Sequence, residues 1–135
     1  MIIHHQRITI IHQSRPAVQN MNEQLQWLGA SLGLFSLRDK DRSCFRIFVE
    51  LLKAAKMDRP LSSDELADQL SLTRGTVVHH LNKLMESGLV VSQHNRYLLR
   101  VDSLENLIDD LARDFDRASK ELKAVARDID LFLGL

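Results

Sequence analysis

The sequence predicts a mainly α-helical fold with one small β-hairpin and a long C-terminal helix. Apolar residues recur every three or four positions over most of the chain, which is the spacing of one helix face. Two short β-type runs flank a tight turn at His94 and Asn95, and an apolar seam then runs without a break from Leu104 to Phe132. A chain of 135 residues corresponds to about one domain, which can bury roughly two-thirds of its unfolded surface.

Charge and cysteine content narrow the class of protein. The formal net charge is +0, but residues 1–57 carry +4, residues 58–101 carry 0 and residues 102–135 carry −4. Opposed ends of this kind can pack against each other or separate a basic face from an acidic one, and both alternatives stay open. The single cysteine, Cys44, excludes an internal disulfide, and its place in a core-type helix predicts a buried, unreactive thiol.

The sequence predicts no membrane span and no leader peptide. It contains no apolar run of about 18 residues, the length that a spanning helix needs. The first stretch, "MIIHHQRITIIHQ", lacks the basic start and the apolar segment of a signal peptide. We therefore expect a cytoplasmic protein.

Residues 1–38 predict a strand or arm followed by a helix. The run "RITIIHQ", residues 7–13, is rich in β-formers and is closed by a turn signal at Pro16. The following apolar stripe consists of Val18, Met21, Leu25, Leu28, Leu32 and Phe35. Gly29 and Gly33 either permit a close approach of another element or weaken and end this helix, and we favour the second alternative. We expect this region to form part of a dimer interface.

Two further helices and a short one between them are predicted before residue 88. The first runs from about Asp41 to Lys56; it buries Phe45, Phe48, Val49 and Leu52 and exposes Arg42, Arg46, Glu50 and Lys53. Ser62 and Glu65 form a capping box that starts a helix over residues 63–70. Only Ser71 and Leu72 separate this helix from Thr73, the cap of the next. The arrangement is a helix-turn-helix.

A β-hairpin follows the helix-turn-helix. Gly88 is a helix C-cap, and strands are expected near residues 89–93 and 96–101, joined by a turn in which Asn95 tolerates a left-handed backbone. Helix, turn, helix and hairpin in this order make a winged helix. The stretch "ELADQLSLTRGTVVHHLNKLMESGLV", residues 65–90, resembles the DNA-binding core of ArsR-like winged-helix regulators, with the MarR and TrmB groups as close relatives. The resemblance covers about residues 42–101 and implies a DNA-binding domain over residues 39–101.

The helix that begins near Arg74 has an inward stripe and an outward face. The inward stripe consists of Val77, Leu81, Leu84 and Met85, and the outward face of Arg74, Gly75, Val78, His79 and Asn82. Arg74 can make a forked contact to guanine, Asn82 can pair with adenine, and Val78 can pack on a thymine methyl group. His79 can donate to a base or a phosphate, and Gly75 lets the helix end come close to DNA.

The candidate DNA contacts extend to the wing. Wing arginines of the superfamily often contact DNA, so the resemblance assigns Arg96 to a phosphate or the minor groove. The full set of expected contacts is Arg74, Gly75, Thr76, Val78, His79, Asn82, Lys83 and Arg96. Thr76 can alternatively support only the helix cap, and Lys83 can be an ordinary solvated lysine. His80 is expected to belong to the fold.

Residues 102–135 predict a coiled-coil-like dimerisation helix. Its seam consists of Leu104, Ile108, Leu111, Phe115, Ala118, Leu122, Val125, Ile129 and Phe132, and all of these except Ala118 are assigned to dimerisation. The helix is roughly 45 Å long, too long for a chain of this size to cover easily. The alternative is that the seam packs on residues 18–35 of the same chain. We favour a mixed bundle that contains both helices of two chains.

The sequence therefore predicts a homodimeric, sequence-specific regulator of transcription that binds double-stranded DNA, with a steric repressor as the default. The alternative is a winged helix that binds a protein partner. No phosphate loop, nucleophile motif or paired-carboxylate constellation indicates an enzyme. No cofactor is expected. Metal sensors among ArsR-like proteins often carry a cysteine pair that "ELADQL" lacks, so no metal site is expected either, and the existence of an effector is left open.

Overall fold

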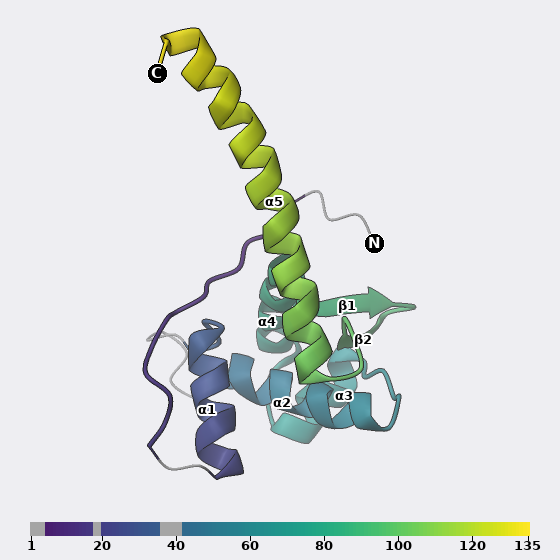
Figure 1. Cartoon of the computed structure of the whole chain (residues 1–135). Helices are drawn as coiled ribbons and strands as arrows, with labels where there is room; N and C mark the ends of the chain where they lie inside the picture. The colour runs from purple at the N-terminus through teal and green to yellow at the C-terminus, as the bar shows by residue number, and fades with distance from the viewer. Residues whose placement is uncertain (1–4, 18–19, 36–41) are drawn as a thin grey trace. The chain divides into compact units, whose positions relative to one another are not determined.

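The computed structural model describes residues 5–17, 20–35 and 42–135 (Figure 1). Within these residues it contains α1 (Met21–Ser31), α2 (Ser43–Lys56), α3 (Ser63–Leu70), α4 (Arg74–Ser87), β1 (Val90–Gln93), β2 (Arg96–Leu99) and α5 (Leu104–Leu133). This order confirms the predicted winged helix-turn-helix with a long C-terminal helix. The chain divides into two compact units, Met1–Asp102 and Ser103–Leu135.

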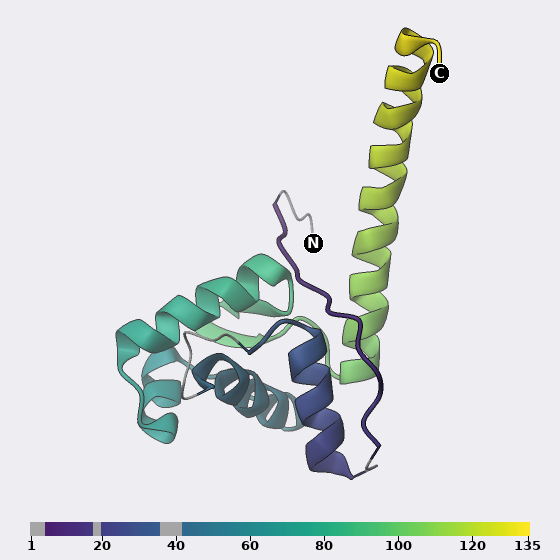
Figure 2. The same ribbon diagram turned by 90° about the vertical axis from the view of Figure 1, so that its left-hand side faces the viewer.

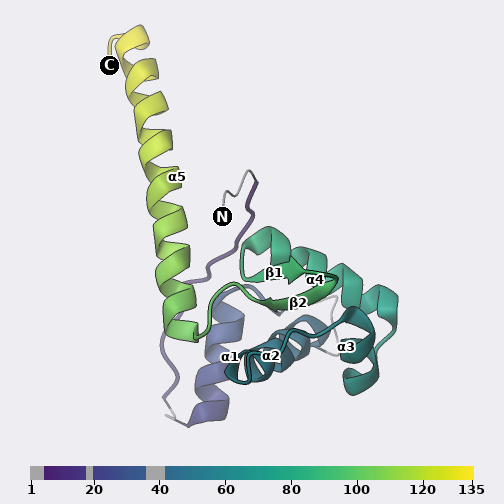
Figure 3. The same ribbon diagram turned by 90° about the vertical axis from the view of Figure 1, so that its right-hand side faces the viewer.

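Helix α2 lies at the centre of the first unit, between α1 and α3 and beneath α4 and the hairpin (Figure 3). Its buried apolar residues are Cys44, Phe45, Ile47, Phe48 and Leu51. The predicted stripe was partly wrong, because Val49 and Leu52 are only half-buried. The buried side is instead the one that contains Ile47 and Leu51, because the elements that pack on α2 decide which of its sides is covered. Cys44 is buried, as expected, whereas Asp41, the predicted start, lies outside the described residues.

The prediction that Arg46 faces solvent was also wrong. The side chain is half-buried, and its Nη2 donates to the backbone oxygen of Leu70 at 2.7 Å. The last carbonyl groups of a helix have no partner within the helix, so a buried helix end needs an external donor. Arg46 supplies that donor to α3 and joins α2 to the helix-turn-helix.

Helix α1 is shorter than the apolar stripe predicted. It begins after Asn20, whose Oδ1 accepts from the backbone N–H of Glu23 at 2.8 Å, while Val18 lies outside the described residues. It ends at Ser31, because the chain turns through Gly33 at a φ of +71°, and Phe35 therefore lies beyond the helix. Met21, placed in the stripe, is exposed. The turn at Gly33 therefore ends α1 before the apolar stripe ends.

The two glycines of α1 and its end have different roles. A Cβ atom on Gly29 would lie 2.6 Å from the ring of Phe45, so α1 and α2 approach closely at this point. Close approach, the alternative that we did not favour, therefore applies to Gly29. The other alternative, that a glycine ends the helix, applies to Gly33 with its positive φ.

Local signals for α3 and α4 are confirmed. Ser62 Oγ accepts from the backbone N–H of Glu65 at 3.1 Å, which starts α3 at the predicted residue. The turn between the helices contains Ser71 in the left-handed region, with a φ of 55°. Gly88, with a φ of +86°, ends α4 as predicted.

The hairpin also matches its prediction. Strands β1 and β2 are antiparallel, with Val90 opposite Leu99 and Gln93 opposite Arg96. His94 and Asn95 have φ values of 54° and 62°, as a two-residue turn with two left-handed residues requires. Leu61 adds a short bridge to β2, because its N–H donates to the oxygen of Tyr97 at 3.0 Å and its carbonyl oxygen accepts from the N–H of Tyr97 at 2.7 Å.

The described part of the N-terminal region, residues 5–17, is an extended arm without strand pairing (Figure 2). Beside α1, the backbone N–H of Ile11 donates to Ser31 O at 2.8 Å, and Trp27 Nε1 donates to Ser14 O at 2.8 Å. Nearer its start, the arm reaches the C-terminal end of α4. There Gln6 Nε2 donates to Ser87 O at 2.7 Å. The arm therefore links α1 to α4.

Helix α5 forms the second unit. It is capped by Ser103, whose side chain accepts from the backbone N–H of Asn106 at 3.2 Å, and it ends before Gly134. None of the helices in the described ranges is long and apolar enough to cross a membrane.

Candidate nucleic-acid interface

Helix α4 carries most of the predicted DNA contacts, and its start is fixed by two threonines. Thr73 Oγ1 accepts from the backbone N–H of Thr76 at 3.1 Å, and the Thr73 hydroxyl donates to Thr76 Oγ1 at 2.8 Å. The cap satisfies a backbone donor that the first turn leaves free. The Thr76 hydroxyl is engaged in this cap, which favours the alternative that Thr76 supports the helix start.

The paired residues of "TVVHHL" divide between the core and the surface. Val77, His80, Leu81 and Leu84 are buried, while Met85, predicted to face inward, is only half-buried. His80 is 7% exposed, so it belongs to the fold as expected. His79 is exposed, and its ring centroid lies 5.3 Å from that of His80. The two histidines therefore do not act as one pair at the surface.

The exposed face of α4 contains Arg74, Gly75, His79, Asn82, Lys83 and Glu86. The prediction that Val78 lies on this face needs correction, because Val78 is half-buried. Its direction on the helix lies between the buried stripe and the exposed face, so only part of the side chain can meet a ligand. Sequence reasoning did not place Glu86 on the same face. Its carboxylate lies toward the C-terminal end of the helix.

Gly75 has no structural reason to lack a side chain. A Cβ atom added there would meet nothing within 4 Å, and α4 continues through the residue as ordinary helix. Glycine in a helix costs about 0.5–1 kcal/mol relative to alanine. The protein therefore keeps a destabilising residue at an open surface, next to Arg74.

Arg74 forms an exposed ion pair. Its Nε lies 3.6 Å from Oδ1 of Asp64, and both side chains are more than two-thirds exposed. Pairs of this kind contribute about 0–1 kcal/mol, because water screens both charges. A phosphate or a guanine edge can therefore replace Asp64 at little cost.

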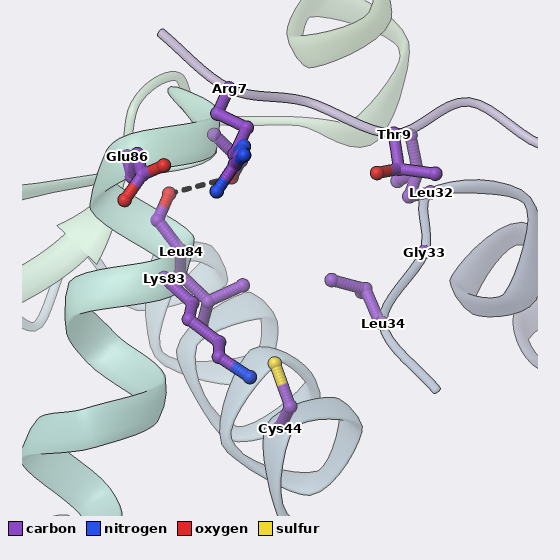
Figure 4. Close-up of a pocket in the computed structure, with 10 residues that line it drawn as sticks. Arg7, Thr9, Leu32, Gly33, Leu34, Cys44, Lys83, Leu84 and Glu86 are labelled. Atoms are coloured by element: carbon purple, nitrogen blue, oxygen red, sulfur yellow. Dashed lines mark hydrogen bonds between the residues drawn. The ribbon is translucent and has the colours of Figure 1, made fainter. Parts of the chain in front are cut away.

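Lys83 points away from the direction of Asn82, since consecutive helical residues differ by about 100°. Its side chain is directed into a cavity of about 260 Å³ between α4, α2 and the N-terminal arm (Figure 4). Cys44 of α2, Leu34 and Arg7 of the N-terminal arm also line this cavity. The amine of Lys83 points toward Cys44 in this cavity, so of the contacts predicted for it only one to a phosphate stays open.

The wing arginine is held by α3. Arg96 Nη1 lies 2.5 Å from Glu65 Oε1, and the same carboxylate lies 3.5 Å from Nη2 of Arg59 through its second oxygen. The Arg96 side chain is still half exposed. Sequence reasoning missed this contact, because 31 residues separate Arg96 from Glu65 and no spacing rule joins a hairpin to a preceding helix. The pair orients the wing relative to the helix-turn-helix.

The charge of Glu65 depends on this arrangement. Desolvation raises the pKa of the Glu65 carboxyl, but the hydrogen bond and charge of Arg96, together with hydrogen bonds from Ser62, outweigh it. The pKa of Glu65 therefore lies below its ordinary value of 4.5. Glu65 is ionised at neutral pH and holds Arg96 as a charged pair.

Helix α5 exposes most of the predicted dimerisation seam. Phe115, Leu122, Val125, Ile129 and Phe132 are between 51% and 90% exposed. Ile108 is also exposed, whereas Leu104 is half-buried and Leu111 is buried. An apolar stripe of this length, exposed to water from Phe115 onward, is typical of a surface that binds a partner.

The described residues contain no group of three or more His, Cys, Asp or Glu side chains that could hold a metal ion. The interface consequently consists of the polar face of α4, the wing and the caps that hold them. A helix presented in this way after a tight turn is the geometry with which helix-turn-helix proteins enter the major groove.

A family model matches part of the chain. Residues 49–92 match the family model described as bacterial regulatory protein, arsR family, which spans the second half of α2, α3, α4 and most of β1. No curated protein and no solved structure matches the chain. The arsR family consists of regulators without enzymatic activity. Residues 49–92 thus match the helix-turn-helix domain of ArsR-family regulators, and this match supports a DNA-binding transcription regulator in general.

Proposed function

We propose that this protein is a homodimeric repressor that binds a specific double-stranded DNA operator. The observation that supports this most directly is the exposed polar face at the start of α4, in the second helix of an ArsR-family domain. Arg74, His79 and Asn82 present the donors and acceptors that distinguish base pairs in the major groove. Bound there, the domain would block access of other proteins to the same DNA.

Each residue of this face has a separate role. Arg74 leaves Asp64 to contact a guanine, and Asn82, two turns further along the helix, contacts an adenine. His79 contacts a base or a phosphate, and the exposed part of Val78 packs on a thymine methyl group. The open surface at Gly75 lets the first turn approach the DNA. Thr76 acts through the cap.

The wing and the side of α4 supply contacts to the DNA backbone. Arg96 keeps its bond to Glu65 through Nη1 and has further N–H donors for a phosphate or the minor groove. Lys83 serves a phosphate at the flank of the groove. Such contacts position the domain without reading sequence.

Dimerisation through α5, with the N-terminal region of residues 1–38 as a second part of the interface, provides the rest of the affinity. The winged domain, residues 39–101, carries ten basic and eight acidic side chains, a net charge of only +2, so one copy alone releases few counterions on binding. Two copies in one dimer can occupy half-sites about 34 Å apart, and the second binding event is then intramolecular.

A second candidate is a winged helix that binds a protein partner. It is favoured by the ion pairs of Arg74 and Arg96 with carboxylates, which reduce the positive field of the face. In that case the exposed apolar seam of α5 would bind the partner, and the α4 face would have no base preference.

Selection from a random duplex DNA library, at a fixed near-physiological salt concentration, separates the two functions. Wild type is compared with Arg74→Ala plus His79→Ala, and with Lys53→Ala plus Lys56→Ala as a control that removes two exposed basic residues from α2. Salt is fixed because phosphate contacts alone retain DNA.

We expect a two-fold symmetric motif from wild type and from the α2 control, and none from the α4 variant. Equal retention of unrelated sequences by all three proteins would remove the base-reading role and favour the protein-binding function.

A further inference from the structure

The exposed part of α5 has an ordered pattern on both sides of its apolar seam. In heptad notation Phe115, Leu122 and Ile129 occupy a positions, and Ala118, Val125 and Phe132 occupy d positions. All six lie in the range from which the helix is exposed to solvent throughout. The seam is therefore open to a second helix over residues 115–132.

The two flanks of the seam differ in charge. Asp114, Glu121 and Asp128 occupy successive g positions, so one flank is acidic. Ser119 and Ala126, at the e positions, make the other flank small and neutral. The basic residues Arg113, Lys120 and Arg127 occupy f positions on the side opposite the seam.

The acidic flank is only partly neutralised within the helix. Asp114 pairs with Arg117, with Oδ1 and Nη2 2.5 Å apart. Among the described residues no ion pair involves Glu121 or Asp128, and both are exposed. Their charges therefore act directly on any helix placed beside the seam.

Whether a second α5 lies parallel or antiparallel to the first determines which residues of the partner lie beside the acidic g positions. In a parallel pair each g position lies beside the e position of the next heptad in the partner. Glu121 then meets the partner's Ala126, and Asp114 meets the partner's Ser119, without like-charge contact. In an antiparallel pair g faces g. Every heptad register then places one acid against another, because all three g residues are acidic.

We propose that α5 pairs in parallel with α5 of a second copy of this chain, and that its acidic g flank excludes the antiparallel pair. This proposal rests on the dimer of the proposed function and adds its orientation. Small residues at the e positions let the two backbones approach closely beside the seam. Both winged domains are then attached at the same end of the pair, where each α5 begins at Leu104.

Disulfide cross-linking distinguishes the two directions. In a Cys44→Ala background, Phe115→Cys and Phe132→Cys are made separately; both side chains are exposed, so neither change removes a core contact. In a parallel pair each variant forms a disulfide with its own copy. Positions 115 and 132 are about 25 Å apart along the helix, so a mixture of the two variants then forms no mixed disulfide.

Mixed disulfides between the two variants, with no self-linked product, would show an antiparallel pair and overturn the proposal. So would a dimer in which neither position cross-links. The oligomeric state of the full chain is measured in parallel by sedimentation. A monomer at all concentrations would instead refute the dimer of the proposed function, so the two failures are distinguishable.

A charge change at the e flank gives an independent readout. Ala126→Lys places a cation beside the partner's Glu121 in a parallel pair, and we expect the dimer dissociation constant to fall about threefold to fivefold at low salt. The matched variant Ala126→Glu adds an acid at the same site and should raise it by a similar factor. A tighter dimer with Ala126→Glu than with Ala126→Lys would contradict the parallel arrangement.

Discussion

Gly29 and Gly75 both lie within helices, but a Cβ atom added at each position would meet different surroundings. At Gly29 the added methyl group of Gly29→Ala would lie 2.6 Å from the Phe45 ring, which is closer than side chains tolerate. Overpacking of this kind costs about 1–3 kcal/mol. At Gly75 the methyl group of Gly75→Ala meets no atom within 4 Å. The same substitution therefore has opposite effects on stability at the two positions.

We predict that Gly75→Ala raises the free energy of unfolding by about 0.5–1 kcal/mol and weakens operator binding about tenfold, or about 1.4 kcal/mol. Urea unfolding measures the first quantity and fluorescence anisotropy of a labelled operator the second. Gly29→Ala is the control, because it should lower stability. Unchanged operator affinity in a stabilised Gly75→Ala variant would mean that the first turn does not approach DNA closely.

The contact between the wing and α3 predicts a pH dependence of stability. The pKa of Glu65 is lowered in the folded protein, chiefly by Arg96 acting against desolvation. Its contribution is therefore complete above the ordinary value of 4.5 and is lost as the pH falls through the lower folded-state pKa. Glu65→Gln should reduce the urea midpoint at pH 7, and the difference from wild type should disappear in acid.

The matched control for this experiment is Asp68→Asn, which removes one exposed carboxylate from the same helix. It should shift the midpoint less than Glu65→Gln at pH 7. If the Glu65→Gln difference persists unchanged at acid pH, the contact with Arg96 does not stabilise the protein through its charge.

At the level of elements, the ends of helices were predicted best from the sequence, because nearby capping residues determine them. Ser62, Thr73 and Gly88 act within one turn of their own residues, and they place the ends of α3 and α4 at the predicted positions. The faces of α1 and α2 were predicted less well. Which side of α2 is buried depends on α1, α3, α4 and the hairpin, which pack on it, and an apolar period contains no information about them.

Distance along the chain explains the contacts that sequence reasoning missed. Arg46 caps a helix 24 residues away, and Arg96 is held across 31 residues. Both are charged residues on periodic elements, where a solvent-facing position is the usual expectation. The exposed face of α4, in contrast, follows from one helix period, and its exposed positions were largely predicted, with Val78 as the exception.

The cap of α4 gives a prediction at the same scale. Thr73→Ala removes the acceptor for the Thr76 N–H and the donor to its hydroxyl, and it should destabilise the protein by about 1 kcal/mol. Because the first turn carries Arg74 and Gly75, operator affinity should also fall. Thr73→Ser keeps the hydroxyl and should restore most of both quantities. Thermal unfolding measures the stability, and fluorescence anisotropy measures the operator affinity. If Thr73→Ser lost as much stability and affinity as Thr73→Ala, the hydroxyl group would be excluded as the cause.

At the scale of the whole molecule, the proposed function depends on how a domain of small net charge obtains enough affinity for DNA. The winged domain carries a net charge of only +2, whereas the exposed α5 seam offers a way to join two copies. Dimer formation and operator binding should then be lost together. Binding of one domain to an isolated half-site should survive, because the α4 face is unaffected.

Leu122→Glu plus Ile129→Glu tests this dependence, since both residues are seam positions that are already more than half exposed. We expect a folded monomer by sedimentation and circular dichroism, with wild-type affinity for a half-site duplex. Its affinity for the complete operator should be at least about a hundredfold lower, within the usual range for a lost second contact. The control Ala124→Glu plus Leu131→Glu adds the same charge at c positions, away from the seam, and should remain dimeric. If the seam variant bound the complete operator as tightly as this control, α5 pairing would have no part in DNA recognition, and each domain would have to bind alone.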